Sequence, residues 1–388
     1  MALGSLQKPN NAPLVGNRSI FGYGHYGKAV KILNESLASQ NGMNAGLLLA
    51  GSLLFATFEV LLKEFSNGYS HINGSLNYLC DLISRSSGEQ GPIFSSFVDV
   101  FARLAISASI FGDEPASLSL DPFAWLASNI HKPCESSLES AGHFVLFSLA
   151  AMRFLQHSSQ STILAKTTSV LGGHTILDLQ EQLLNAIRTW QISMQQAKSR
   201  SQNMLSYDRV TLLKIYMKYC EIVVSAFTLN GSHSSEVRYD KYISEFSELL
   251  HLCKGFIKHN DPESIEQDGM RYPSFTIHIG IIHILWYICI KCRDPSLRRE
   301  ALCMLASCHH AEGDTFDGIM IAGYAEMVIR LEEGPEGVEC AEDLPYERRI
   351  RKPHFNIVHD DHILHCEKGD FKLGPEWTTW QPVCAFSV

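Results

Sequence analysis

One stretch of the chain constrains the fold more than any other: CIKCRDPSLRREALCMLASC, residues 289–308. A very apolar helix is predicted to end in a Lys-Cys-Arg-Asp-Pro corner, and a basic amphipathic helix restarts directly after it. Proline fits the first turn of a helix but not its interior, so the corner is a helix boundary. The stretch therefore predicts two consecutive helices that meet at a charged corner.

Composition limits the class of protein. A chain of 388 residues with 45% hydrophobic and 19% charged residues can bury one large core or two fused ones. The net charge of −9 argues against a nucleic-acid partner, because DNA binding requires a basic face that displaces counterions. Eleven scattered cysteines and an N-terminus without a signal pattern predict free thiols in the cytoplasm.

Two apolar runs have the length of a membrane span, residues 45–62 and 275–290. The first contains Glu59, and the second contains His278 and His283. Because ionisable groups in lipid are costly, we expect buried helices of a large helical domain and no stable membrane span.

Apolar residues recur at helical spacing through most of the chain. The fold class predicted is all-α, an irregular array of paired helices in an N-terminal arm (1–24), a helical domain (25–335) and a C-terminal extension (336–388). In the extension, 355–358 and 362–365 alternate around Asp360 and Asp361 and predict a short β-hairpin that acts as a lid or clasp. The helices are expected at 26–38, 44–63, 69–83, 95–110, 138–156, 178–196, 208–227, 240–258, 275–292, 296–307 and 317–331.

Several segments resemble the regulatory domain of fungal zinc-cluster transcription factors, over about His25 to Glu333. They are HYGKAVKILNESLAS, LLFATFEVLL, SNGYSHINGSLNYL, YDKYISEFSELL and IKCRDPSLRREAL. Regulators of this family carry a six-cysteine module that holds two zinc ions, yet Met1 to His71 contains no cysteine. We therefore expect a regulatory domain without its DNA reader, either a partner-binding protein or an enzyme on the same scaffold.

The chain also resembles the atypical fungal sesquiterpene cyclases that make humulene-type products. That resemblance implies an all-helical cavity, farnesyl diphosphate as the substrate, Mg²⁺ at the diphosphate and a lysine that helps to hold it. The matching lysine is Lys291. The alternative is that Lys291 only caps the carbonyl groups at the end of a helix.

Ionisation of an allylic diphosphate requires cations at the leaving oxygens and an apolar, aromatic-lined pocket. Leu285, Trp286 and Tyr287 precede Lys291 and offer such a surface, with Tyr287 four residues before the lysine and on the same face. Aromatic faces stabilise cations without supplying a nucleophile. The alternative is that these three residues belong to an ordinary core.

The Asp-rich DDxxD motif of terpene cyclases is missing from the sequence. Asp240, Ser244 and Glu248 follow the spacing of the second cyclase motif, at i, i+4 and i+8, so one helix face could present their oxygens to Mg²⁺. The alternative is a solvated helix face. Glu59 is a fourth candidate ligand, because a carboxylate in an apolar run must be paired, protonated or metal-bound. Pairing with Lys63 is the simpler explanation.

A zinc site is a further alternative, because Cys289 and Cys292 form a CxxC followed by Cys303, Cys308, His309 and His310. The leading prediction remains a magnesium-dependent sesquiterpene cyclase that acts on an isoprenoid diphosphate. The opposing prediction is a non-enzymatic regulatory domain that binds a helical partner or a small effector and does not bind DNA. A homo-oligomer is compatible with either function.

Overall fold

The structure, a computed structural model of the chain, describes part of the sequence. All statements below concern those residues. They are 17–38, 45–61, 65–85, 96–98, 100–105, 148, 176–200, 207–226, 236–259, 275–276, 280–308, 311–312, 318–350, 353–358, 361–365 and 383–384.

The described residues are mainly helical, as the sequence predicts. The chain divides into two compact units, one of residues 1–108 and 115–122 and the other of 109–114 and 123–388. Each unit is described by itself. The boundaries predicted for the arm, the helical domain and the C-terminal extension differ from those of the two units, and this division stays a prediction.

The first unit contains α1 (Asn17–Ala38), α2 (Ala45–Leu61) and α3 (Phe65–Arg85), and residues 96–98 and 100–105 are also helical. The prediction that the first helix begins near His25 was wrong, because α1 begins at Asn17. Its early turns pack on α2: the Tyr23 ring meets the edge of Phe58 at 5.8 Å, and the Tyr26 ring stacks on Phe58 at 4.6 Å. This packing offsets the low helix propensity of the nearby glycines.

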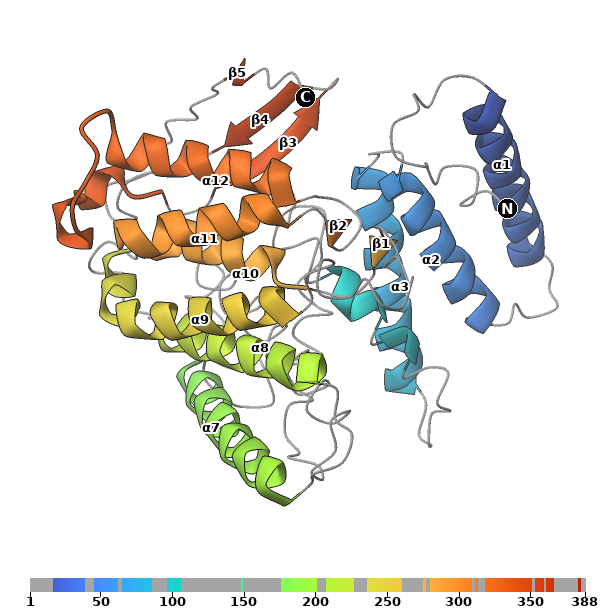
Figure 1. Ribbon diagram of the computed structural model, residues 1–388. Coiled ribbons are helices and arrows are strands. Elements are labelled where there is room, and N and C mark those ends of the chain that lie inside the picture. The colour runs from blue at the N-terminus through green and yellow to red at the C-terminus, as the bar shows by residue number, and fades with distance from the viewer. Residues whose placement is uncertain are drawn as a thin grey trace. The chain divides into compact units, whose positions relative to one another are not determined.

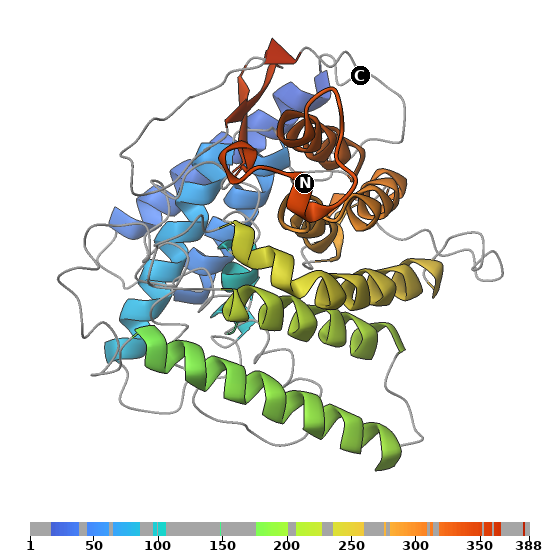
Figure 2. The same ribbon diagram turned by 90° about the vertical axis from the view of Figure 1, so that its left-hand side faces the viewer.

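The second unit is a succession of helices in which each lies beside the next, as Figures 1 and 2 show from α7 to α12. Most bounds lie within about two residues of those predicted, which is the scatter expected at helix ends. The elements are α7 (Ile176–Arg200), α8 (Tyr207–Ser225), the 3₁₀ helix η4 (Val237–Tyr242), α9 (Ile243–His259), α10 (Ile282–Lys291), α11 (Pro295–Ser307) and α12 (Gly318–Glu333).

Two predicted helices begin later than expected. The helix predicted over 275–292 is α10, which begins at Ile282. The backbone before it is held elsewhere, because the Tyr216 hydroxyl donates to the Gly280 carbonyl oxygen at 2.7 Å. The helix predicted over 240–258 begins at Ile243, and η4 precedes it. The helix predicted over 138–156 lies outside the described residues except for Ser148.

Helix α10 is the centre of the second unit. All ten of its residues are buried, including His283 and Lys291. It packs against α9, α11 and α12. A helix that is apolar all round and surrounded in this way is a core helix, so any polar group it carries must find its partner inside the protein.

Short strands complete the described part. β1 (Phe275–Thr276) pairs in parallel with β2 (Ala311–Glu312). β3 (His354–Val358), β4 (Asp361–His365) and β5 (Val383–Cys384) follow one another in a second sheet, with Phe355 opposite Leu364. The connection at 359–360 lies outside the described residues, so the hairpin as a clasp stays a prediction.

Neither apolar run forms a transmembrane helix in the described part of the chain, where every helix is too short or too polar to cross a bilayer. The first run supplies α2, and the second supplies β1 and α10.

Gly318 begins α12 at a very close approach to the end of α11. A Cβ atom at this position would lie 2.2 Å from the Cys308 carbonyl oxygen and 2.5 Å from the Leu305 carbonyl oxygen. We expect Gly318→Ala to lower the free energy of unfolding by about 1–3 kcal/mol, because backbone atoms must move to admit the methyl group. Urea denaturation measures the change.

The matched control is Gly323→Ala on the same helix, where a Cβ would meet nothing within 4 Å. That substitution should stabilise the protein by about 0.5–1 kcal/mol, because alanine favours the helix. Equal effects of the two substitutions would contradict the close approach at Gly318.

Candidate functional site

The charged corner between α10 and α11 has the form that its sequence predicts. Helix α10 ends at Lys291, and Cys292 after it is extended. Asp294 caps α11, because its side chain accepts a hydrogen bond from the Leu297 backbone N–H at 2.9 Å, and Pro295 occupies the first turn. The corner thus places Lys291 and Arg293, two residues apart, in the interior of the unit.

Lys291 is buried in an ion pair. Its side chain is 10% exposed, and its Nζ donates to the two carboxylate oxygens of Glu236 at 2.8 and 2.9 Å. The same Nζ lies 5.4 Å from the centre of the Tyr239 ring, within the range of a cation–π contact. The charge of the lysine is therefore neutralised by a carboxylate 55 positions earlier in the chain.

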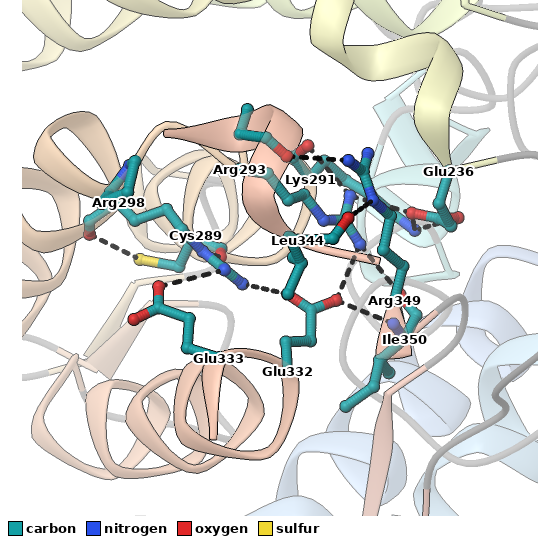
Figure 3. Close-up of polar contacts among 12 residues, drawn as sticks. Glu236, Cys289, Lys291, Arg293, Arg298, Glu332, Glu333, Leu344, Arg349 and Ile350 are labelled. Carbon is teal, nitrogen blue, oxygen red and sulfur yellow. Dashed lines mark hydrogen bonds and ion pairs between the residues drawn. The ribbon is translucent and has the colours of Figure 1, made fainter. Parts of the chain in front are cut away.

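Arg293 binds two carboxylates and two backbone carbonyl groups (Figure 3). Its Nη1 lies 2.9 Å from a Glu236 oxygen, and its Nη2 lies 2.9 Å from Glu332 Oε1. Nη1 also donates to the Lys291 carbonyl oxygen, and Nη2 to that of Ile350. One guanidinium group thereby joins the residue before η4, the corner, the end of α12 and the chain that leads to β3.

Arg298 repeats this role from the first turn of α11. Its Nε donates to the Cys289 carbonyl oxygen at 2.8 Å, and its two Nη atoms reach Glu332 and Glu333. Arg299, half-exposed, also binds Glu333. We call the group Glu236, Lys291, Arg293, Arg298, Glu332 and Glu333 the charge lattice.

Burial and pairing act in opposite directions on the pKa values of the lattice. Burial by itself would raise the pKa of Glu332, but the guanidinium groups of Arg293 and Arg298 outweigh it and lower the pKa below its usual value. Burial by itself would lower the pKa of Arg293, and Glu332 and Glu236 outweigh it and raise that pKa. Both groups are therefore charged at neutral pH.

A second ion pair lies beside the lattice. Arg349, 3% exposed at its side chain, binds both carboxylate oxygens of Asp240 through Nη1, at 2.7 and 2.8 Å. Its other nitrogens donate to the carbonyl oxygens of Leu344 and Ala341. Two neighbouring residues of η4 thus have different partners: Asp240 binds Arg349, and Tyr239 contacts Lys291.

A cluster of buried rings adjoins the Lys291 ion pair. The Tyr287 ring meets Tyr219 edge-on at 4.8 Å and Tyr239 at 6.1 Å, and His283 stacks on Tyr216 at 5.5 Å. Burial, and then the neighbouring Tyr239, raise the pKa of Tyr287 well above its usual value. These separations are those of rings packed directly against one another.

The sequence-predicted pocket residues are buried together on α10. Leu285 is 0%, Trp286 2% and Tyr287 6% exposed. The structure brings Tyr287 and Lys291 together on the Tyr239 ring. That arrangement agrees with the predicted shared face of Tyr287 and Lys291.

The predicted magnesium ligands Asp240, Ser244 and Glu248 do not lie on one continuous α-helix. Asp240 lies in η4, whose 3₁₀ geometry breaks the i, i+4, i+8 spacing assumed for a continuous helix, and it binds Arg349. Ser244 is exposed, and Glu248, 58% exposed at its side chain, binds Lys218 at 2.7 Å. Within the part of the chain that the structure describes, no group of three or more His, Cys, Asp or Glu side chains is arranged to hold a metal ion.

Glu59 belongs to the first unit and has neutral hydrogen-bond donors. It is 9% exposed and accepts hydrogen bonds from the Tyr26 hydroxyl and, at 3.5 Å, from the Asn67 amide. Burial lowers the pKa of the nearby His71, and Glu59 partly opposes that change. The alternative partner Lys63 lies outside the described residues.

The zinc alternative finds no support in the thiols. Cys289 and Cys292 are buried and free, and burial raises the pKa of each thiol to about 12. Among the described residues, no group of three or more His, Cys, Asp or Glu side chains that could hold a metal ion includes these thiols. His309 and His310 lie outside the described residues.

Sequence reasoning missed Glu236, Arg293, Arg298, Arg349 and the pair Glu332–Glu333. One signal was available: two carboxylates end α12, where the negative end of the helix dipole disfavours them. Acidic residues at the C-terminal end of a helix indicate that basic side chains from other segments bind them. Glu236 had no comparable local signal.

Comparison with known proteins adds no relative to this description. No protein-family model matches the chain, and neither a curated protein nor a solved structure matches it significantly.

Two Glu→Gln substitutions on α12, one inside the lattice and one outside it, should differ strongly in their effect on the free energy of unfolding. Glu332→Gln should lower the free energy of unfolding by about 3–5 kcal/mol, because it leaves Arg293 and Arg298 buried with less negative charge. Glu326→Gln, which removes an exposed pair with Arg330, should change it by less than about 1 kcal/mol. Chemical denaturation of both variants checks this, and equal losses would contradict a stabilising lattice.

The same carboxylate predicts a pH dependence. Because the pKa of Glu332 is lower in the folded protein than in the unfolded chain, its stabilisation is complete above the unfolded pKa of about 4.3. It is lost as the pH falls through the lower folded value. Urea denaturation from pH 7 to pH 3 should show a steeper loss of stability in the native protein than in Glu332→Gln, with Glu326→Gln like the native protein.

Proposed function

We propose that the chain is a non-enzymatic regulatory domain, which binds a protein partner or a small effector through its helical scaffold and does not itself bind DNA. One observation carries the proposal: Lys291, the residue expected to hold a diphosphate, is bound by Glu236 inside a charge lattice. The net charge of −9 supports the absence of DNA binding.

The other expected catalytic groups support the same conclusion. Asp240 binds Arg349 and Glu248 binds Lys218, whereas an enzyme of this kind needs carboxylates that converge opposite the lysine. The rings of Tyr219, Tyr239 and Tyr287 contact one another, and rings in contact act as core packing. The clasp formed by the C-terminal hairpin is part of this proposal, as an element that closes on the scaffold.

A sesquiterpene cyclase is the second candidate. The contact of Lys291 Nζ with the Tyr239 ring, beside further buried aromatic rings, favours it, because such rings stabilise carbocations. In this function the diphosphate group of farnesyl diphosphate would replace Glu236 at the lysine, and Mg²⁺ would neutralise the diphosphate as it leaves; ring closure and proton loss would then give a humulene-type hydrocarbon.

One variant distinguishes the two functions. Under the regulatory proposal, Lys291→Met removes a buried charged hydrogen bond and should lower the free energy of unfolding by about 1.5–3 kcal/mol. The native protein, incubated with farnesyl diphosphate with and without Mg²⁺, should give no volatile hydrocarbon in gas chromatography with mass spectrometry.

If the protein is a cyclase, the opposite result is expected. A magnesium-dependent hydrocarbon from the native protein, lost in Lys291→Met that remains folded, would overturn the regulatory proposal. Glu236→Gln is the matched control, because a carboxylate that only blocks the diphosphate would, when neutralised, increase turnover. Geranyl and geranylgeranyl diphosphate test other substrate lengths.

A further inference from the structure

The segment between α12 and β3 is anchored to the second unit at a few points. Residues 341–350 include two short 3₁₀ helices, η6 (Ala341–Asp343) and η7 (Tyr346–Arg348). Ala341, Leu344 and Ile350 are 0–2% exposed, while residues 345–348 between these anchors are exposed. A segment of this kind lies on the surface and is held from its inner side.

Arg349 is the residue that joins this segment to η4. Its Nη2 and Nε donate to the carbonyl oxygens of Ala341, at 2.9 Å, and Leu344, at 3.2 Å. Its Nη1 binds both oxygens of Asp240. The guanidinium group therefore holds its own segment through Nε and Nη2 and holds η4 through Nη1.

η4 and the residue before it also hold Lys291. Glu236, directly before it, binds Lys291 and Arg293, and the Tyr239 ring lies against Lys291. A helix of six residues has little stability by itself, so its place depends on these contacts and on Asp240.

We propose that residues 341–350 are a strap that closes η4 over Lys291, and that release of Arg349 from Asp240 opens η4 and exposes Lys291. The strap controls access to Lys291 under either proposed function, since any ligand that binds this lysine must first replace Glu236.

The opening is local. The end of the strap is also bound to the lattice, because the Ile350 N–H donates to Glu332 at 2.7 Å and Arg293 donates to the Ile350 carbonyl oxygen. These bonds do not involve Arg349 or Asp240. Loss of the Arg349–Asp240 pair should therefore free η4 while α10, α11 and α12 keep their packing.

Acetylation of lysine amines tests the strap directly. The full chain is treated with an acetyl N-hydroxysuccinimide ester, and mass spectrometry follows Lys291 over time. Lys254, 64% exposed at its side chain, is the internal reference. Arg349→Met should increase the labelling rate of Lys291 about tenfold or more, because a buried charged pair is lost, while Lys254 is unchanged.

The neighbouring residue supplies the matched control. Arg348 is exposed, so Arg348→Met should leave the labelling of Lys291 at the native rate. Asp240→Asn breaks the same pair from the side of η4 and should reproduce the effect of Arg349→Met, which keeps the test decisive if one variant folds poorly.

Two results would overturn the proposal. In the first, Lys291 is labelled in both pair variants at the native rate. In the second, the buried thiol of Cys289, 0% exposed, gains reactivity toward a thiol reagent in step with Lys291. That outcome would mean that the whole unit opens and that the strap has no separate role.

Discussion

The carboxylate of Glu332 is the charge on which the arrangement of the second unit depends. It is 0% exposed and accepts hydrogen bonds from Arg293, Arg298 and the Ile350 N–H. A lone charge in this position would be strongly unfavourable, so the three donors and the carboxylate need one another. Through them the corner after α10, the first turn of α11, the end of α12 and the chain toward β3 are fixed together.

The lattice also explains why a lysine can end a core helix. Helix α10 is buried along its whole length, and an unpaired ammonium group there would be strongly unfavourable. Glu236 and the Tyr239 ring give Lys291 a charge partner and a polarisable face. A stable buried ion pair is thus sufficient to explain the lysine and the aromatic ring that first resemble a reactive site.

The sequence predicted the features that depend on residues close together in the chain. Asp294 and Pro295 define the start of α11 through local capping, and the apolar spacing located most other helices. It could not predict Glu236 on Lys291 or Arg349 on Asp240, which join residues 55 and 109 positions apart. The sequence also suggested that Asp240, Ser244 and Glu248 lie on one continuous helix. In the structure Asp240 lies in η4, and Ser244 and Glu248 lie in α9.

The sharing of charges in the lattice restricts how its sequence can diverge. Glu332 serves two guanidinium groups, and Arg298 serves two carboxylates. Replacement of any single member leaves at least one buried neighbour with one charge partner fewer, so single substitutions lower stability unless two or three positions change together. Positions 293, 298, 332 and 333 should therefore change together in evolution. A related protein could lose the lattice only if apolar residues replaced the whole group.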